Sequence, residues 1–563
     1  MQLMVSICNF KSTAIIALVL ALSMVLESAA ALPAAIAAPL LKAVTTSVVG
    51  LGVTVPVGVV ALLQRVSGSV GLAPPTASML ADENPKSECA LFRHVPELAD
   101  KLAWRSLGAL KTTPIHKCKV PSLLLSSSSG NKNNMEEDLE FLVKREDLLS
   151  PLYGGNKVRT LQHQLAICEA RRERGETSFR QLVSVGTGGS NQIIATIVHA
   201  RSLGWGDDET DKKDGVAPGP PPSRVNLCYL DKDEPDLDNT LNMLSALSFP
   251  NIGWRYNWGQ LSTLKVPAFL NAIRGAWSQK DCVPMMVGGN CASGVLGQVG
   301  GMIELAEQIA AGESPDPRRI YLPVGSACTI SGLIIGTVLA RRLGIPALSS
   351  DGDFKIVGCL VHDIATKLQG LCGLYTNPRL GFMPLTVTYS VKKACAALLE
   401  LGGPDLEADA LEFIKTSVEI RADPVVVGPY GGHSEATRAA ARLYDEKGSA
   451  VDAAGKEVKN LWVCGHFVGK ALEPMLRDLE KAKSSTSSSG DEETTAPNYM
   501  LWMTKSAVQP RGSVDEWSIM LKENEQVLQW ANEGKAESSL RPARVSTRDG
   551  SPDDYRSVMT KVL

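Results

Sequence analysis

The stretch SVGTGGSNQIIATIVHARSLG, residues 184–204, contains a short apolar run, a glycine-rich turn and an apolar segment with helical spacing, in that order. Ser190 and Asn191 stand at the entrance of the predicted helix. Such side chains cap helices, and together with the free amides of a helix start they can also orient a ligand or hold an anion. The stretch therefore predicts a strand, a turn and a helix, with either a cap or a ligand site at the junction.

A second stretch, YLPVGSACTISGLIIGTVLA at residues 321–340, repeats this layout. Its predicted strand ends at Val324 and its helix begins near Ser331. The turn between them consists of Gly325, Ser326, Ala327, Cys328 and Thr329. Successive backbone amides and two hydroxyl groups suit a phosphate, although the turn is not a P-loop because G-x-x-x-x-G-K-[ST] is absent.

Strand-like and helix-like segments alternate from about residue 140 onward. The predicted strands are Gln181–Val185, Val225–Leu230, Pro284–Val287, Ile320–Val324, Lys355–Val361, Pro424–Val427, Leu461–Cys464 and Tyr499–Met503. The predicted helices include Ile303–Ala311, Leu333–Leu343 and Glu435–Tyr444. This alternation predicts an α/β fold built of βαβ units, with parallel sheets covered by helices on both faces.

A third stretch, VKREDLLSPLYGGNKVRTLQHQL at residues 143–165, places a lysine where a helix begins. The apolar spacing after it predicts Asn156 as the N-cap and Lys157 as the first helical residue. The amides of a helix start carry roughly half a positive charge, which disfavours an ammonium ion and favours a neutral, nucleophilic amine. A neutral amine is what Schiff-base chemistry needs, whereas an isolated lysine would be a solvated surface charge.

Three turns of this kind, one of them with a lysine, suggest a phosphorylated aldehyde cofactor. The order K-R-E-D-L, G-G-N-K-x-R and S-N-Q resembles the pyridoxal-phosphate family that contains D-cysteine desulfhydrase and 1-aminocyclopropane-1-carboxylate deaminase. Similar segments follow in the same order, at residues 287–309, 325–333, 428–443 and 466–472. The resemblance covers roughly residues 105–508. It implies a fold type II enzyme with two doubly wound domains and pyridoxal 5'-phosphate in the cleft between them.

The resemblance also implies roles for individual residues. Lys157 would bind the cofactor covalently, Ser190 would face the substrate, and Tyr430 would lie beside the substrate. Asn191 would contact the ring hydroxyl of the cofactor. The remaining cofactor-binding positions would be Gly325, Ser326, Ala327, Cys328 and Thr329, of which the last three would hold the phosphate.

Two positions depart from the family pattern. Where relatives have a tyrosine in P-V-Y-x-G-K, this chain has Phe467, which cannot transfer a proton. In the deaminase branch a glutamate at the next position pairs with the pyridine nitrogen, but here that position is Val468. Thr504 resembles the threonine that serves this purpose in the desulfhydrase branch. A hydroxyl leaves the ring nitrogen largely neutral and suits elimination of a good leaving group better than opening of a cyclopropane ring.

The expected function is therefore a pyridoxal-phosphate-dependent lyase or deaminase acting on a small amino acid, in the manner of D-cysteine desulfhydrase, by α,β-elimination to a keto acid and ammonia. Two alternatives stay open. One is an amino-acid racemase or deaminase of the same fold. The other is a non-catalytic protein that kept the fold and binds the cofactor or an amino acid, which Phe467 and Val468 favour.

Composition limits the classes of partner. Lysine plus arginine (57) nearly balances aspartate plus glutamate (60), and no arginine-rich run is interleaved with aromatic residues, so a nucleic-acid partner is not expected. The twelve cysteines show no C-x-x-C spacing and the seven histidines form no H-E-x-x-H, so the sequence suggests neither a metal site nor a disulfide framework. His433 and His466 lie near the predicted site, but turn or packing roles explain them equally well. We expect a homodimer.

The N-terminal part differs from the rest. Lys11 precedes the apolar run Thr13–Leu26 and small residues near Ala29, which is the layout of a signal peptide. The uncharged stretch Ala43–Leu63 is long enough to span a bilayer, which takes about 20 residues, although its glycines and threonines lower its hydrophobicity. A membrane association through residues 43–63, an organelle-targeting presequence and ordered structure are all compatible with this composition, and the destination (plastid, mitochondrion or secretory route) stays open.

The chain is long enough for two to four domains. We expect residues 1–85 to be a targeting or membrane segment and residues 86–508 to be the catalytic region. Within that region the smaller domain covers about 186–300, and polar, low-complexity loops are expected at 207–223 and 483–497. Residues 509–563 should form a helical extension, because Ser513 and Glu516 have the spacing of a capping box ahead of an apolar stripe.

Overall fold

The structure is a computed structural model. It describes residues 70–122, 138–206, 223–229, 235–255, 282–285, 287–348, 354–362, 382–428, 431–458, 462–487, 498–506, 508–512, 529–530, 532–533, 545–548 and 551–552. By internal contacts the chain divides into two units, residues 1–63 with 364–389, and residues 64–363 with 390–563. Every site described below lies in the second unit.

A seven-stranded sheet forms the larger layer of the second unit. Its strand order is β10 (Ser449–Val451), β1 (Ile115–Pro121), β2 (Asp138–Lys144), β11 (Tyr499–Trp502), β7 (Arg319–Val324), β8 (Lys355–Leu360) and β9 (Val418–Arg421). The strands from β2 to β9 run parallel to one another, with Met500 opposite both Leu142 and Ile320, whereas β1 is antiparallel to β2 and to β10. Parallel strands are buried on both faces, and β11 is buried along its whole length.

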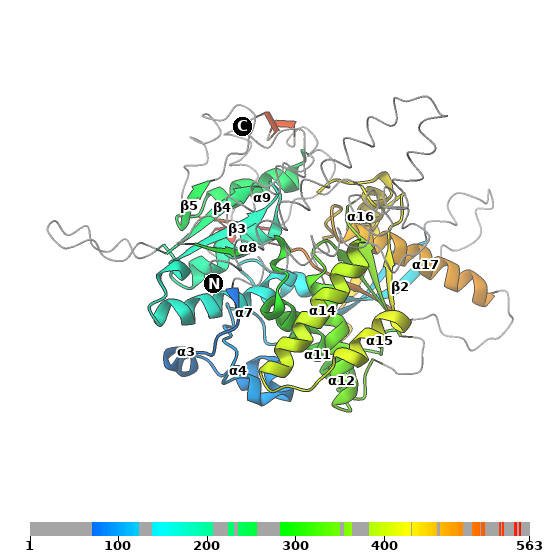
Figure 1. Cartoon of the computed structure of the whole chain (residues 1–563). Helices are drawn as coiled ribbons and strands as arrows, with labels where there is room; N and C mark the ends of the chain where they lie inside the picture. Colours follow the sequence, from blue (N-terminus) through cyan, green and yellow to red (C-terminus); the bar gives the residue numbers. More distant parts are fainter. Residues whose placement is uncertain are drawn as a thin grey trace, which may run out of the picture. The chain divides into compact units, whose positions relative to one another are not determined.

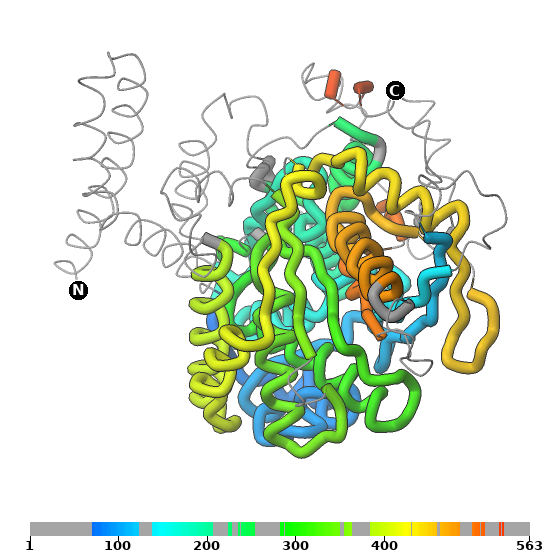
Figure 2. Tube along the Cα trace, turned by 90° about the vertical axis from the view of Figure 1, so that its right-hand side faces the viewer, coloured from blue at the N-terminus to red at the C-terminus, as the bar shows by residue number. Residues whose placement is uncertain are grey.

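Helices cover the two faces of this sheet. On one face, α16 (Glu435–Lys447) and α17 (Gly469–Ser487) share a hydrophobic cluster with the strands, in which Phe141, Tyr321 and Leu501 meet Leu472 and Met475. Figure 2 shows α17 in orange along the strands that it contacts. Elsewhere α12 (Cys328–Arg342) contacts β7 and β8 and packs against α11 (Ala292–Ala310), which in turn packs against α7 (Asn156–Glu173).

A smaller, four-stranded sheet is built from the segment between β2 and β7. Its order is β5 (Ile252–Arg255), β4 (Arg224–Tyr229), β3 (Gln181–Gly186) and β6 (Val283–Met285), and all its neighbours are parallel. Figure 1 shows α8 (Asn191–Ser202) and α9 (Leu237–Leu247) with this sheet, and α8 contacts both β3 and α9. Two parallel sheets joined by helices confirm the α/β fold class.

The remaining elements are not part of these two sheets. They are α3 (Ala77–Asp82), α4 (Pro85–Glu88), α5 (Ala90–His94), η2 (Pro96–Leu98), η3 (Glu146–Leu148), η4 (Thr177–Arg180), η6 (Val287–Gly289), α14 (Phe382–Glu400), α15 (Glu407–Ser417), β12 (Val508–Arg511), β13 (Val545–Arg548) and β14 (Ser551–Pro552). Helix α5 packs against α11. Residues 70–85, which the sequence analysis set apart from the fold, include α3 with its buried Met79.

Most predicted strands lie within two residues of an observed one. Two predictions were wrong: residues 424–426 form a turn, with Val425 61% exposed, and residues 462–464 are irregular backbone ahead of α17. Residues 483–487 of the predicted loop at 483–497 belong to α17, and residues 488–497 lie outside the described residues. In the predicted helical extension the structure describes the helical residues 529–530 and 532–533 as well as the strands β12, β13 and β14, while residues 513–528 lie outside the described residues. No helix of the described residues is long and apolar enough to cross a membrane, and the stretch 43–63 is not among them.

Candidate active site

Helix α7 begins one residue earlier than predicted. Its N-cap is Gly155, with φ 95°, so the prediction of Asn156 as N-cap was wrong. A Cβ atom on Gly155 would lie 2.5 Å from the carbonyl oxygen of Thr504, and that same oxygen accepts a hydrogen bond from the Asn156 amide at 3.1 Å. Both the positive φ and the close approach require glycine. The start of α7 is therefore fixed against the chain that follows β11.

Lys157 projects from this first turn towards the segment 287–289. Its Nζ donates to the carbonyl oxygen of Gly288 at 3.3 Å, and the residue is partly buried. Burial lowers the pKa of Lys157, because the charged form loses solvation. The direction agrees with the neutral amine that the sequence predicted, although loss of solvation is the main cause here.

The turn before α12 lies next to Lys157. Gly288, with φ 70°, separates the two: a Cβ atom there would lie 2.2 Å from Ser326 Oγ and 3.6 Å from Lys157 Nζ. Ala327 has φ 67° and is the N-cap of α12, which begins at Cys328, three residues earlier than predicted. The first amides of a helix have no partner within the helix, so the turn offers several N–H groups to an anion.

Side-chain bonds join this turn to α7 and to the segment before α11, and they join α7 to α11. Asn156 Nδ2 donates to Thr329 Oγ1 at 2.7 Å, and Gln298 Nε2, from α11, donates to Thr160 Oγ1 at 2.9 Å. Asn290 Nδ2 donates to the carbonyl oxygen of Ser326. Burial raises the pKa of the Cys328 thiol to about 12, so this side chain is neutral. The structure thus brings Lys157 together with Ser326, Ala327, Cys328 and Thr329, while their roles towards a cofactor remain predictions.

Ser190 and Asn191, two further predicted site residues, lie at the start of α8. Ser190 is the N-cap, and its Oγ accepts from the Ile193 amide at 3.4 Å. Asn191 Oδ1 accepts two bonds, from the Tyr153 hydroxyl at 2.9 Å and from Asn242 Nδ2 at 3.0 Å. These two donors orient the carboxamide so that its NH₂ group is left to donate in another direction.

Tyr153 is itself held by a buried histidine. His199, on α8, lies 2.9 Å through Nε2 from the carbonyl oxygen of Tyr153. Burial lowers the pKa of His199 to about 4, so at neutral pH the imidazole is uncharged and Nε2 carries the hydrogen that it donates. A chain of bonds therefore runs from α8 through Tyr153 back to Asn191 at the start of the same helix.

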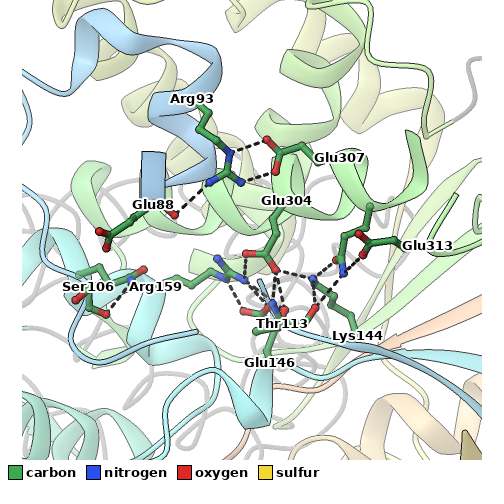
Figure 3. A network of polar contacts seen from close by, with 12 residues as sticks. Glu88, Arg93, Ser106, Thr113, Lys144, Glu146, Arg159, Glu304, Glu307 and Glu313 are labelled. Atoms are coloured by element: carbon green, nitrogen blue, oxygen red, sulfur yellow. Dashed lines mark hydrogen bonds and ion pairs between the residues drawn. The ribbon is translucent and has the colours of Figure 1, made fainter. Parts of the chain in front are cut away.

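The four residues of the K-R-E-D motif, Lys144 to Asp147, are buried charges. Lys144 Nζ lies 2.7 Å from Glu304, and Arg159 lies 2.8 Å from Glu304 and 2.6 Å from Glu146 (Figure 3). Arg145 forms a bidentate pair with Asp147. This network ties α7, α11 and the end of β2 together next to Lys157. Sequence analysis found the motif but not this role; a run of four charges directly after an apolar strand was the available signal.

Four further positions from the sequence analysis remain, of which the structure describes three. Thr504 is buried, and its backbone contacts Asn156 as described above. Val468 is fully buried in the hydrophobic cluster under α16 and α17, so the position of the deaminase glutamate belongs to the core here. Phe467 is half-buried in the turn before α17. Tyr430 lies outside the described residues.

The residues present fit pyridoxal phosphate. The amine of Lys157 and the Ser326 turn are separated only by Gly288, where a Cβ atom would clash with Ser326. The turn itself holds Ala327 in a left-handed conformation that costs on the order of 1 kcal/mol or more, and such strain is typical of ligand-binding turns. Lys157 would hold the aldehyde carbon, the amides of residues 326–329 the phosphate, and Asn191 the ring hydroxyl.

Comparison with known proteins gives two sequence relatives. Nocardicin C-9' epimerase from Nocardia uniformis subsp. tsuyamanensis is 30% identical over 293 residues, which cover 50% of this chain and 77% of that protein. D-cysteine desulfhydrase from Salmonella paratyphi C (strain RKS4594) is 30% identical over 205 residues, which cover 35% of this chain and 52% of that protein. No family model matches the chain.

Similar solved structures have low sequence identity. An ACC deaminase homologue is 17% identical with a TM-score of 0.45, and the match covers 80% of this chain and 100% of that one. Threonine deaminase isoform 2 from Solanum lycopersicum is 12% identical with a TM-score of 0.37, and the match covers 82% and 97%.

Proposed function

The chain belongs to the fold type II pyridoxal-phosphate family of D-cysteine desulfhydrase and 1-aminocyclopropane-1-carboxylate deaminase, and from this premise we propose that it is a pyridoxal-phosphate-dependent lyase acting on a small amino acid. The proposed reaction is α,β-elimination from a D-cysteine-like substrate, which gives a keto acid and ammonia. One observation carries the proposal: the partly buried amine of Lys157 lies beside the turn at the start of α12, with Gly288 between them.

We assign separate roles in such a reaction to the side chains of the site. When bound, pyridoxal phosphate supplies an electron sink for charge that develops at the Cα atom of an amino acid. Lys157 is the group that we assign to move the Cα proton, because its lowered pKa increases the neutral fraction that can accept a proton. The oxygen of Ser190 accepts from the Ile193 amide, so its own hydrogen is left to donate to the substrate.

The residues at the two positions that the family resemblance assigns to the ring nitrogen favour elimination over cyclopropane opening. Val468 offers no carboxylate, and its burial in the core leaves no room for one beside a cofactor. Thr504 is the hydroxyl that we assign to the ring nitrogen. A neutral ring nitrogen makes a weaker electron sink, which suffices when the β-substituent is a good leaving group.

Epimerisation or racemisation of an amino acid is a second candidate. Nocardicin C-9' epimerase, the relative of which this chain covers 77%, supports this candidate. Phe467 also supports it, because a phenylalanine cannot protonate a leaving group. Both reactions begin with removal of the Cα proton. They differ in whether the proton returns to the opposite face or the β-substituent departs.

The cofactor assignment is tested on the purified full-length chain. We expect the visible absorbance of lysine-bound pyridoxal phosphate, and after borohydride reduction a peptide carrying the cofactor mass at Lys157. Lys157→Ala should abolish both signals, whereas Lys144→Met, at a buried lysine outside the site, should keep the visible band in whatever fraction folds. A band that survives in Lys157→Ala would contradict the assignment.

The reaction is tested with a panel of D- and L-amino acids that carry leaving groups at Cβ. Elimination should release a keto acid and ammonia in equal amounts, together with sulfide from D-cysteine. Inversion at Cα without keto acid, detected by chiral chromatography, would support epimerisation instead. Cofactor binding with neither product would mean that the chain kept the fold without turnover.

A further inference from the structure

Three side chains to which the sequence analysis assigned no chemical role lie close together in the structure. Asp236 is the N-cap of α9, His433 lies in the loop before α16, and His466 lies in the turn before α17. His433 Nε2 is 2.9 Å from Asp236 Oδ2, and His466 Nε2 contacts the same oxygen. The donor atoms of all three lie within 4.8 Å of one another, and His466 is 0% exposed. No spacing in the sequence signals this cluster, because the three segments are far apart.

The bonds around His466 argue that a cation belongs between these atoms. Asn239 Nδ2 lies 3.5 Å from His466 Nε2, and its bond to the carbonyl oxygen of Gly431 at 2.8 Å fixes the NH₂ group on that side. Nε2 therefore faces the N–H donor of Asn239, towards which it would present a lone pair. It also faces the carboxylate of Asp236, and a lone pair on Nε2 would be repelled by that carboxylate. A metal ion coordinated by Nε2 and Oδ2 resolves this conflict, since both atoms then use a lone pair towards the same cation.

The second nitrogen of the same ring is placed as in many metal sites. His466 Nδ1 lies 3.5 Å from Cys464 Sγ and 4.0 Å from Asp238 Oδ2. A metal-binding histidine commonly donates its other N–H to an acceptor that fixes the ring and its tautomer. Cys464 and Asp238 would serve as these acceptors, outside the ligand set.

Lys505 decides on which side of the ring the cation lies. Its Nζ is 3.9 Å from Asp238 Oδ2 and 5.7 Å from the centre of the Trp462 ring, and it is buried without a hydrogen-bond partner among the residues that the structure describes. A fixed ammonium beside Asp238 and Cys464 disfavours a second cation there. On the Nε2 side the Arg438 guanidinium acts on His433, but Asp236 offers a carboxylate in direct contact with both histidines.

We propose that Asp236, His433 and His466 bind a divalent transition metal of the zinc class. Two imidazole nitrogens and one carboxylate oxygen are a ligand set that zinc accepts, with a fourth position open to water or a substrate group. The open position distinguishes this arrangement from a closed structural site. The proposal does not depend on the reaction proposed above.

The site would couple metal binding to the predicted cofactor site through α9. Asp236, Asn239 and Asn242 follow one another at three-residue intervals, so they share one face of the helix. Asn239 reaches His466, while Asn242 bonds to Asn191, the residue assigned to the cofactor ring. A metal ion at Asp236 would therefore fix the helix that orients Asn191, and it would join the loops before α16 and α17 to that helix.

The experiment measures metal content of the full-length protein, purified without a histidine tag, treated with chelator and then dialysed against zinc chloride. We expect about one equivalent of zinc by mass spectrometry of the elements and a higher melting temperature with zinc, because binding to the folded state stabilises it. His433→Ala and Asp236→Asn should lose the metal and the shift. His94→Ala is the matched control, because His94 pairs with Glu307 outside the cluster and should keep both.

Variants at Cys464 separate the two possible ligand sets. Cys464→Ser should keep one equivalent at saturating zinc but weaken zinc binding by roughly ten- to a hundredfold, as loss of an orienting partner does. Cobalt(II) in place of zinc should show no thiolate-to-metal charge-transfer band. Such a band, with loss of metal in Cys464→Ser, would overturn the ligand set in favour of Asp238, Cys464 and His466. Absence of zinc uptake by the folded wild-type chain, checked by circular dichroism, would overturn the metal site itself.

Discussion

At the scale of single residues, the site depends on two glycines at positions where no other residue fits. Gly155 and Gly288 have positive φ and approach Thr504 and Ser326 more closely than any Cβ atom allows. Both stand in motifs that the sequence analysis recognised. What the sequence did not reveal is which contact each glycine permits, because those partners lie 349 and 38 residues away along the chain, respectively.

Gly288→Ala should displace the Ser326 turn and weaken cofactor binding. A Cβ atom would lie 2.2 Å from Ser326 Oγ, so Ser326 or the segment 287–289 must move. Gly312→Ala is the matched control, because Gly312 has a similar φ of 75° but no atom within 4 Å of its Cβ position. Both variants should lose about 1 kcal/mol of stability through backbone strain, and Gly288→Ala alone should lose pyridoxal-phosphate affinity, measured by titration of the visible band.

Val468→Glu should unfold the protein rather than create a deaminase. Val468 is fully buried in the cluster under α16 and α17, and a carboxylate there would have neither water nor an ion-pair partner in that apolar cluster. We expect a loss of roughly 4 kcal/mol or more in the free energy of unfolding. Val425→Glu, at an exposed valine, should change stability little. A folded Val468→Glu that opens the cyclopropane substrate would contradict this view of the position.

At the scale of elements, the ion pairs of Lys144, Arg159 and Glu304 join β2, α7 and α11. Burial alone would raise the pKa of Glu304, but the charges of Arg159 and Lys144 outweigh it and hold the pKa at about 2. The pKa of Glu304 falls from 4.5 in the unfolded chain to about 2 in the folded protein. The carboxylate therefore stabilises the fold at pH values above 4.5, and this contribution is lost as the pH falls towards 2.

Glu304→Gln should therefore destabilise the protein in a pH-dependent way. Removing one partner of a buried ion pair costs roughly 3–5 kcal/mol, because the other charges are left uncompensated. Glu307→Gln, one turn later on α11, removes a partly exposed pair with Arg93 and should cost at most about 1 kcal/mol. Urea unfolding at pH 7 and pH 3 should show a difference between wild type and Glu304→Gln that shrinks at pH 3. A difference that does not depend on pH would contradict the assigned charge.

The elements also show how far sequence patterns reach. The central strands β3, β7, β8 and β11 were predicted because strands buried on both faces are continuous apolar runs. Strand β1 was missed because Lys117 and Lys119 alternate with buried residues at one side of the sheet. The run at 424–427 was assigned to a strand for its composition, yet Val425 is exposed in a turn.

At the scale of the whole molecule, the limits of prediction follow from distance along the chain. Lys157, the Ser326 turn and Asn191 could be proposed from the sequence because each lies within a local motif. The cluster of Asp236, His433 and His466 was not, since only folding brings its members together. The burial of the K-R-E-D charges was not predicted either, because charged residues are mostly exposed.

Three buried histidines should make the whole molecule sensitive to mild acid. Burial lowers the pKa of His116, His163 and His199 to about 4 each. Because the unfolded chain binds these protons near pH 6.5, each histidine removes stability as the pH falls from 6.5 towards 4, by up to about 1.4 kcal/mol per pH unit. Melting temperatures should decline over this range, and His199→Gln should decline less steeply than wild type. His94→Gln, at a partly exposed histidine, is the control, and an equal slope in His199→Gln would count against this account.

The thiol of Cys328 gives the chain an internal reporter. It is buried in the very turn assigned to the phosphate, 3.7 Å from Thr160 Oγ1, and a thiol with so high a pKa reacts slowly even when reached. An alkylating reagent can therefore modify it only while the start of α12 is open. The rate of that modification, followed by peptide mass, would time how often the turn opens with and without pyridoxal phosphate.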